Sequence, residues 1–142
     1  RQLPLDKKGE LVQAHPDFQL VISYNPGYQS LMKDLKQSTK QRFAAMDFDY
    51  PTDGVEAQIV AQEAGVDADV AQKLVQIAHR TRNLKGHGLD EGISTRLLVY
   101  AAQMINEGID AKLACQMTLV TPLTDDPDMR QTLEAAVETF FT

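Results

Sequence analysis

The chain has 142 residues, of which 43% are hydrophobic and 24% are charged, a balance typical of a globular domain and not of a disordered or collagen-like chain. Fourteen basic and 20 acidic residues give a formal net charge of −6, which disfavours nucleic acid as the main partner. We find no signal-peptide pattern and no apolar run of membrane-spanning length. The single cysteine, Cys115, cannot form an internal disulfide, and together these features favour a cytoplasmic protein.

The first predicted element is a β-hairpin near the N-terminus. Two short apolar segments, residues 3–5 and 10–14, flank the sequence Asp-Lys-Lys-Gly at residues 6–9. This is a turn sequence in which Gly9 supplies the positive φ that a tight hairpin requires.

Two further strands are predicted before Pro51. Residues 18–23 are nearly all apolar and β-branched at their centre, a pattern typical of a strand buried on both faces in a parallel sheet. Residues 46–50 alternate apolar and acidic side chains, as on a half-buried strand. Between them, Ser38 is placed to cap a short helix over residues 39–43.

From Pro51 onward helical periodicity dominates, and we predict about five helices. Asp53 with Glu56 three residues later has the form of a capping box, and Gly65 is a natural stop. The second helix is expected to continue as far as Gly86. The helix starts are expected at Asp53, Asp67, Ser94, Asp110 and Asp126. The predicted fold class is therefore mainly α, with a hairpin and one or two sheet strands followed by a helical bundle.

Asn25 is the first candidate site residue. It follows the buried-type strand within Ser23-Tyr24-Asn25-Pro26-Gly27, and ligands bind at the carboxyl ends of strands in open parallel sheets. An amide at that position can orient a water molecule or hold a phosphate oxygen. The structural alternative is an asparagine that simply closes a turn.

Arg96 is the second candidate. If Ser94 is the helix cap, Arg96 lies in the first helical turn, where the helix dipole disfavours a cation and favours an anion. An arginine placed against that preference suits an anionic ligand held together with the free backbone N–H groups. The alternative is a solvated arginine on a helix that begins elsewhere.

Other chemistry-bearing patterns are absent from the sequence. His15, His79 and His87 are scattered, so no cysteine–histidine spacing suggests a metal site. Cys115 lies in an apolar context and is expected to be a small buried residue. No Gly-x-x-x-x-Gly-Lys-Ser/Thr loop and no dinucleotide fingerprint occur in these residues.

Two stretches carry a specific family pattern: HPDFQLVISYNPGY at residues 15–28 and LKQSTKQRF at residues 35–43. Three shorter segments extend it, at residues 47–51, 63–66 and 92–96. Together they closely resemble the CbbQ/NirQ/NorQ branch of the MoxR AAA+ ATPases, and the resemblance covers nearly the whole chain.

The resemblance implies a role for each candidate residue. Asn25 matches sensor 1, which helps to position the attacking water near the γ-phosphate. Arg42 matches the arginine finger that reaches the nucleotide of a neighbouring subunit, although the pattern of charges alone indicates only a solvated basic pair with Lys40, and either of the two is a candidate finger. Arg96 matches sensor 2, which the helical lid directs at the nucleotide phosphates.

The resemblance also implies how the chain is divided and what it works with. Residues 1–50 correspond to the end of the AAA+ α/β core, and residues 51–142 correspond to the helical lid. The Walker A and Walker B motifs are expected before residue 1, so ATP and Mg²⁺ are expected in the complete protein, and this chain alone is expected to be inactive as an ATPase. Family members are hexameric remodelling chaperones with a von Willebrand factor A-domain partner and a target enzyme, such as Rubisco or nitric oxide reductase.

Two other classes of function are alternatives to this one. The first is a stand-alone helical interaction module without an ATPase parent; a strand of the type at residues 18–23 without sheet partners argues against it. The second is a small helical nucleic-acid-binding domain, which the acidic net charge disfavours.

Overall fold

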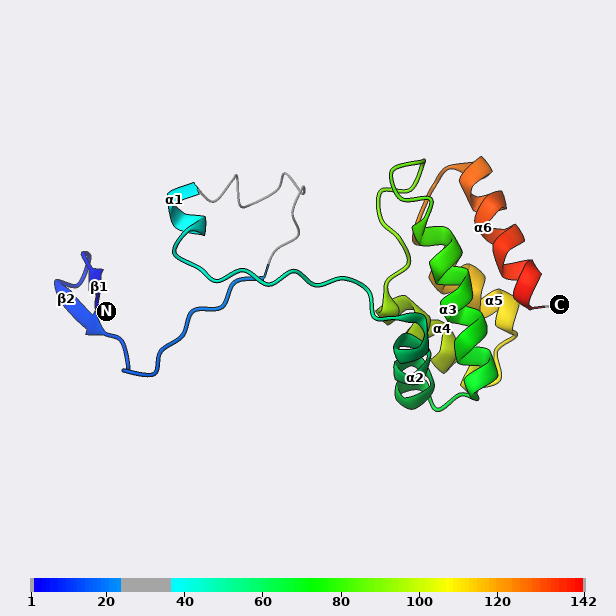
Figure 1. The fold of residues 1–142 in the computed structure, drawn as a ribbon, viewed down its shortest axis with the longest axis horizontal. Coiled ribbons are helices and arrows are strands. Elements are labelled where there is room, and N and C mark those ends of the chain that lie inside the picture. The colour runs from blue at the N-terminus through cyan, green and yellow to red at the C-terminus, as the bar shows by residue number, and fades with distance from the viewer. Residues whose placement is uncertain (1, 24–36, 142) are drawn as a thin grey trace. The chain divides into compact units, whose positions relative to one another are not determined.

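A computed structural model describes residues 2–23 and 37–141 of the chain. The chain divides into two compact units, Arg1–Met46 and Asp47–Thr142, which we call the N-terminal unit and the helical unit and describe separately (Figure 1).

The hairpin of the N-terminal unit is confirmed. Strand β1 (Gln2–Leu5) pairs in antiparallel fashion with β2 (Glu10–Gln13), with Leu3 opposite Val12. Gly9 has a φ of 64°, the left-handed conformation that a residue without a Cβ adopts at little cost.

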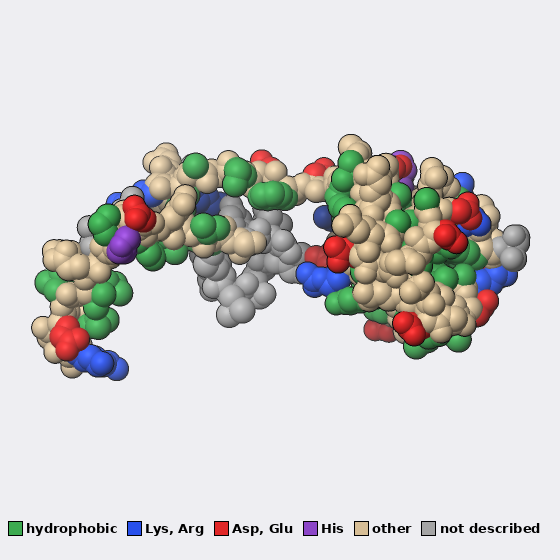
Figure 2. Space-filling model, turned by 90° about the horizontal axis from the view of Figure 1, so that it is seen from below, with side chains coloured by type: hydrophobic (Ala, Val, Ile, Leu, Met, Phe, Trp, Pro, Cys, Tyr) green, Lys and Arg blue, Asp and Glu red, His purple; other side chains and the backbone are tan. Residues whose placement is uncertain are grey.

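The two single strands expected at residues 18–23 and 46–50 are not strands in the structure. A strand needs a hydrogen-bonded neighbour, and the sheet of the described residues consists of β1 and β2 alone. Val21 is 81% exposed and Phe48 is 89% exposed. Hydrophobic side chains (green in Figure 2) accordingly lie open along the hairpin and the extended chain that follows it.

The short helix predicted near Ser38 is present but differs in extent. Helix α1 covers Gln37–Lys40, so Ser38 lies inside the helix and does not cap it. The chain then leaves the helix in a tight turn, in which the N–H of Arg42 donates to the carbonyl of Thr39 at 3.0 Å.

The helical unit is a bundle, as the periodicity after Pro51 predicts. It contains α2 (Asp53–Ala64), α3 (Ala68–Arg82), α4 (Thr95–Asn106), α5 (Ala111–Cys115), the π-helical segment η1 (Gln116–Val120) and α6 (Pro127–Phe140). The described chain is thus mainly helical with an N-terminal hairpin, which confirms the predicted fold class.

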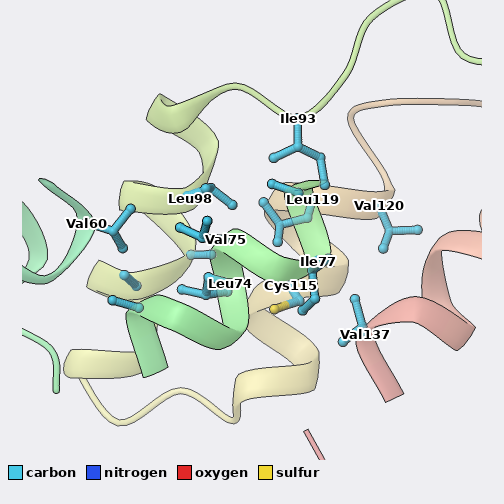
Figure 3. Packing of buried hydrophobic residues seen from close by; sticks show 14 of the residues in the cluster. Val60, Leu74, Val75, Ile77, Ile93, Leu98, Cys115, Leu119, Val120 and Val137 are labelled. Carbon is cyan, nitrogen blue, oxygen red and sulfur yellow. The ribbon is translucent and has the colours of Figure 1, made fainter. Parts of the chain in front are cut away.

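The helices of this unit enclose one apolar core. Helix α3 contacts α2, α4 and α6, and Figure 1 shows it beside these helices in the bundle. Figure 3 shows side chains from several helices pointing into the shared interior, among them Leu74 of α3, Leu98 of α4 and Leu119 of η1, each fully buried. Cys115 is buried in the same cluster, as its apolar context predicts.

Most predicted helix ends are confirmed. The side chains of Ser94, Asp110 and Asp126 each accept a hydrogen bond from a backbone N–H of the following first turn, which satisfies one of the donors that a helix start leaves unpaired. Gly65 ends α2 with a φ of 70°. Helix α3 ends at Arg82, before Gly86.

None of the described helices combines the length and the apolar character that crossing a membrane requires.

Candidate functional site

Arg96 lies in the first turn of α4, where the sequence predicts it. Ser94 is the N-cap with extended backbone angles (φ −80°, ψ 153°), and its hydroxyl accepts from the N–H of Leu97 at 3.4 Å. Arg96 is exposed, and no acidic residue occurs in the first turn. Within the described residues it has no acidic partner at ion-pair distance. Its guanidinium is therefore available to an anion at a helix start that also favours one.

A buried ion pair holds the start of this helix. The carboxylate of Glu56 on α2 is completely buried, and it accepts from both terminal nitrogens of Arg82, Nη1 to Oε2 and Nη2 to Oε1, each at 2.7 Å. Thr95, the first residue of α4, donates its hydroxyl to Glu56 Oε1 at 2.6 Å. This two-pronged geometry is the strong form of a carboxylate–guanidinium contact.

Arg82 also binds the backbone that leads into α4. Its Nε donates to the carbonyl of Ile93 at 2.9 Å, one residue before the Ser94 cap. The Glu56–Arg82 pair therefore holds the chain on both sides of Ser94, through Ile93 before it and Thr95 after it.

Two neighbours enclose the Arg82 side chain. Its guanidinium carbon lies 3.6 Å from the centroid of the Tyr50 ring, a cation–π distance. On another side the backbone of Gly92 approaches so closely that a Cβ there would lie 2.7 Å from Arg82 Cγ. The φ of Gly92 is not positive. Glycine is therefore needed here because there is no room for a Cβ, and not because of the backbone conformation. Only 11% of the Arg82 side chain remains exposed.

The charge of Glu56 is compensated inside the bundle. Burial by itself raises the pKa of the Glu56 carboxyl, but the hydrogen bonds from Arg82 and Thr95 and the positive charge of Arg82 more than offset this, so that the pKa lies below its ordinary value. Glu56 is therefore ionised at neutral pH, and the pair is internally neutral.

The capping role predicted for Glu56 is wrong. Thr52 is the N-cap of α2, with no hydrogen bond from its side chain, and Asp53 is the first helical residue. Glu56 instead opens the buried stripe of the helix, which continues with Val60 and Ala64. A glutamate at the head of an i, i+4, i+8 apolar stripe is the signal that sequence reasoning missed, because such a position points into the core.

The described structure does not place the three predicted site residues relative to one another. Asn25 lies outside the described residues. Arg42 is exposed in the turn after α1, in the N-terminal unit. Arg96 belongs to the helical unit. Their expected shared function stays a prediction.

The other titratable groups of residues 2–23 and 37–141 form no second candidate site. No group of three or more histidine, cysteine or acidic side chains capable of holding a metal ion occurs in the described part of the chain. Burial, with a smaller contribution from the charge of Asp110, raises the pKa of the Cys115 thiol to about 12, so this thiol is not a nucleophile at neutral pH.

Fold and site together define a small helical domain that presents an exposed arginine at a capped helix start. The family described as CbbQ/NirQ/NorQ C-terminal matches residues 56–140, more than half of the chain. The chain belongs to this family, as its sequence resemblance predicts. The matched region begins at Glu56 and includes Arg82, Thr95 and Arg96.

Curated relatives extend the match beyond the helical unit. The chain is 70% identical over 141 residues to Protein CbbQ of Hydrogenophilus thermoluteolus, covering 99% of this chain and 53% of that protein. It is 47% identical to Protein NorQ of Paracoccus denitrificans over 99% of this chain and 52% of that protein. It is 51% identical to the denitrification regulatory protein NirQ of Pseudomonas aeruginosa over 89% and 49%. The chain thus spans about half the length of the curated relatives it matches.

Proposed function

We propose that this chain is the C-terminal part of an AAA+ remodelling ATPase that activates or matures a target enzyme. The family match and the high identity to Protein CbbQ support the proposal. The chain spans about half of such a relative. In this proposal, the nucleotide-binding core with the Walker motifs belongs to the half of the full-length protein that this chain does not cover. The complete protein would form a ring and act with a von Willebrand factor A-domain partner.

The observation that carries the proposal is the start of α4. Arg96 stands exposed beside the unpaired N–H groups of a capped helix start, without a carboxylate in the first turn. A nucleotide phosphate fits this donor set, because it offers several acceptor oxygens and negative charge. We assign Arg96 the role of sensor 2, which contacts the nucleotide of its own subunit.

The other two roles rest on the sequence match. Arg42 is proposed as the finger that a subunit offers to its neighbour's nucleotide, and its exposure is compatible with that role. Lys40, in the last turn of α1, is the alternative, but it lacks the planar fork that grips phosphate oxygens in two places. Asn25 is proposed as sensor 1.

The described residues offer donors for the phosphates of a nucleotide but no ligand cluster for its Mg²⁺ ion. No cluster of three potential metal ligands occurs among them, so the proposal places the Mg²⁺ ligands outside the described part of this chain. When bound, Mg·ATP supplies the free energy of phosphoryl transfer. What this chain contributes is charge and hydrogen-bond donors that orient the phosphates.

The test is nucleotide binding by the full-length protein that carries this chain. We expect Arg96→Ala to weaken binding of a fluorescent ADP analogue roughly tenfold or more, the range of a charge-assisted hydrogen bond. Arg80→Ala is the matched control, since Arg80 is an exposed arginine of α3 whose guanidinium lies over the Phe140 ring. Thermal unfolding of each variant separates binding from folding. Unchanged affinity in a folded Arg96→Ala protein would remove the assignment.

A further inference from the structure

We propose that Glu56, Arg82 and Thr95 form a positioning unit that sets the direction of Arg96 toward the nucleotide phosphates. The inference rests on the proposed function of Arg96. It assigns a role to a buried ion pair that neither the family match nor the sequence reasoning assigns.

The positioning unit contacts the chain on both sides of the Ser94 cap. Arg96 directly follows Thr95, whose hydroxyl is 2.6 Å from Glu56 Oε1. On the other side of the cap, the Ile93 carbonyl accepts from Arg82 Nε at 2.9 Å. Two hydrogen bonds to one rigid pair therefore fix both the approach to α4 and its first residue. A first turn fixed in this way offers Arg96 and the free N–H groups in one direction.

A buried ion pair contributes little net stability by itself. Taking both charges out of water costs about as much as their attraction returns, and apolar residues of similar volume often serve as well or better. What the pair supplies beyond packing is direction. The Arg82 fork has donors at fixed angles, and three of its nitrogens are bonded to defined partners in α2 and in the segment before α4.

Two neighbouring residues cover the Arg82 side chain of the pair. The Tyr50 ring centroid lies 3.6 Å from the Arg82 guanidinium carbon, and the Gly92 backbone also packs closely against the Arg82 side chain. Both exclude water, and hydrogen bonds in a dry environment are stronger and better defined. The Glu56 carboxylate is neutralised by Arg82. It therefore does not compete with a phosphate group for the Arg96 guanidinium.

The experiment is a double-mutant cycle between Thr95 and Arg96 in the full-length protein, read by binding of the fluorescent ADP analogue. Thr95→Val keeps the shape and removes the donated hydrogen bond. We expect it to weaken binding about three- to tenfold and expect Thr95→Ser, which keeps the hydroxyl, to restore most of the affinity. In an Arg96→Ala background, Thr95→Val should change affinity no further.

Thr118→Val is the matched control. Thr118 is another part-buried threonine, whose hydroxyl donates to the Ala114 carbonyl at 2.7 Å and makes no hydrogen bond to the Glu56–Arg82 pair. Thr118→Val also removes one part-buried hydroxyl hydrogen bond, and it should leave affinity unchanged. Arg82→Lys, which keeps the charge and loses the fork, should weaken binding in the same manner as Thr95→Val.

Three outcomes overturn the inference, and they differ from one another. If Thr95→Val leaves affinity unchanged, the positioning unit of Glu56, Arg82 and Thr95 has only a structural role. If Thr95→Val weakens binding equally with and without Arg96, the positioning unit affects nucleotide binding independently of Arg96. If Arg96→Ala itself has no effect on affinity, the proposed function fails, and the positioning role fails with it.

Discussion

The two units of this chain differ in how far their apolar side chains are exposed. In the helical unit, Leu74 and Leu98 are fully buried and the helices enclose one core. In the N-terminal unit, Leu3, Leu11 and Val21 are each more than half exposed. The hairpin forms nevertheless, because its turn and register are local. A buried-type strand does not form by itself, because the partners that define it must come from other strands.

The difference separates function from folding in a way that mutations can test. In the helical unit, Glu56, Arg82 and Thr95 are expected to affect both stability and nucleotide binding. In this chain by itself, exposed residues of the N-terminal unit are expected to leave stability unchanged.

The largest effect is expected at Arg42 in the N-terminal unit. In the full-length protein, Arg42→Ala should bind ATP in its own pocket and hydrolyse it slowly, since arginine fingers contribute roughly 10³ to 10⁵ in rate where they are best measured. Because Arg42 is exposed, thermal unfolding should be unchanged. Steady-state ATP turnover and nucleotide affinity, measured on the same sample, check the prediction.

A mixing experiment distinguishes action on a neighbour from action within one subunit. Arg42→Ala subunits mixed with Walker-defective subunits should regain some turnover, because an intact pocket can then face an intact Arg42. Mixed rings that demonstrably assemble and stay inactive would exclude Arg42 as the finger and favour Lys40.

The second effect is on the stability of the helical unit. Arg82→Met leaves the fully buried Glu56 carboxylate without its charged partner, which should lower the free energy of unfolding by about 3–5 kcal/mol. Urea unfolding followed by circular dichroism measures this loss. The double variant Glu56→Leu with Arg82→Met should recover most of the stability, and failure to recover it would mean that packing around Arg82, and not the unpaired charge, causes the loss.

The helices were predictable because their signals are local. Ser94, Asp110 and Asp126 each bond within the next three residues, so the cap and its partner lie in one short stretch of sequence. The position of Arg96 followed from the Ser94 cap. By the same logic, the hairpin turn at Gly9 was predictable from four residues.

The Glu56–Arg82 pair was not predictable in this way, since its members are 26 residues apart and meet only through tertiary packing. Glu56 also satisfies the capping-box pattern, so a local rule gave a plausible but wrong role. The prediction of a strand at residues 18–23 was wrong for a related reason. Its apolar pattern is typical of a strand covered by neighbouring strands, and the described residues contain no such neighbours for it.

The third effect is a pH dependence confined to the helical unit. The pKa of Glu56 is lowered by folding, so its contribution to stability is fully present above the ordinary glutamate value of about 4.3 and is lost as the pH falls through the folded-state value. Glu56→Gln removes this titration. We expect wild-type stability to decrease more steeply than that of Glu56→Gln below about pH 4.3, as measured by urea unfolding at a series of pH values. Parallel curves would mean that Glu56 does not titrate differently on folding.

The smallest effect is expected from a matched pair of valines, one in each unit. Val75 is 1% exposed and Val21 is 81% exposed. In this chain Val75→Ala should lower the free energy of unfolding by roughly 1.5–3 kcal/mol through lost burial and a cavity, while Val21→Ala should stay within about 0.5 kcal/mol. In the full-length protein, the family resemblance predicts that residues 18–23 join a parallel sheet. There Val21→Ala should become as costly as Val75→Ala, because the same side chain would then be covered by neighbouring strands. If Val21→Ala remains neutral in the full-length protein, residues 18–23 are not the sheet strand that would lead to Asn25, and the proposed sensor 1 assignment loses its structural basis.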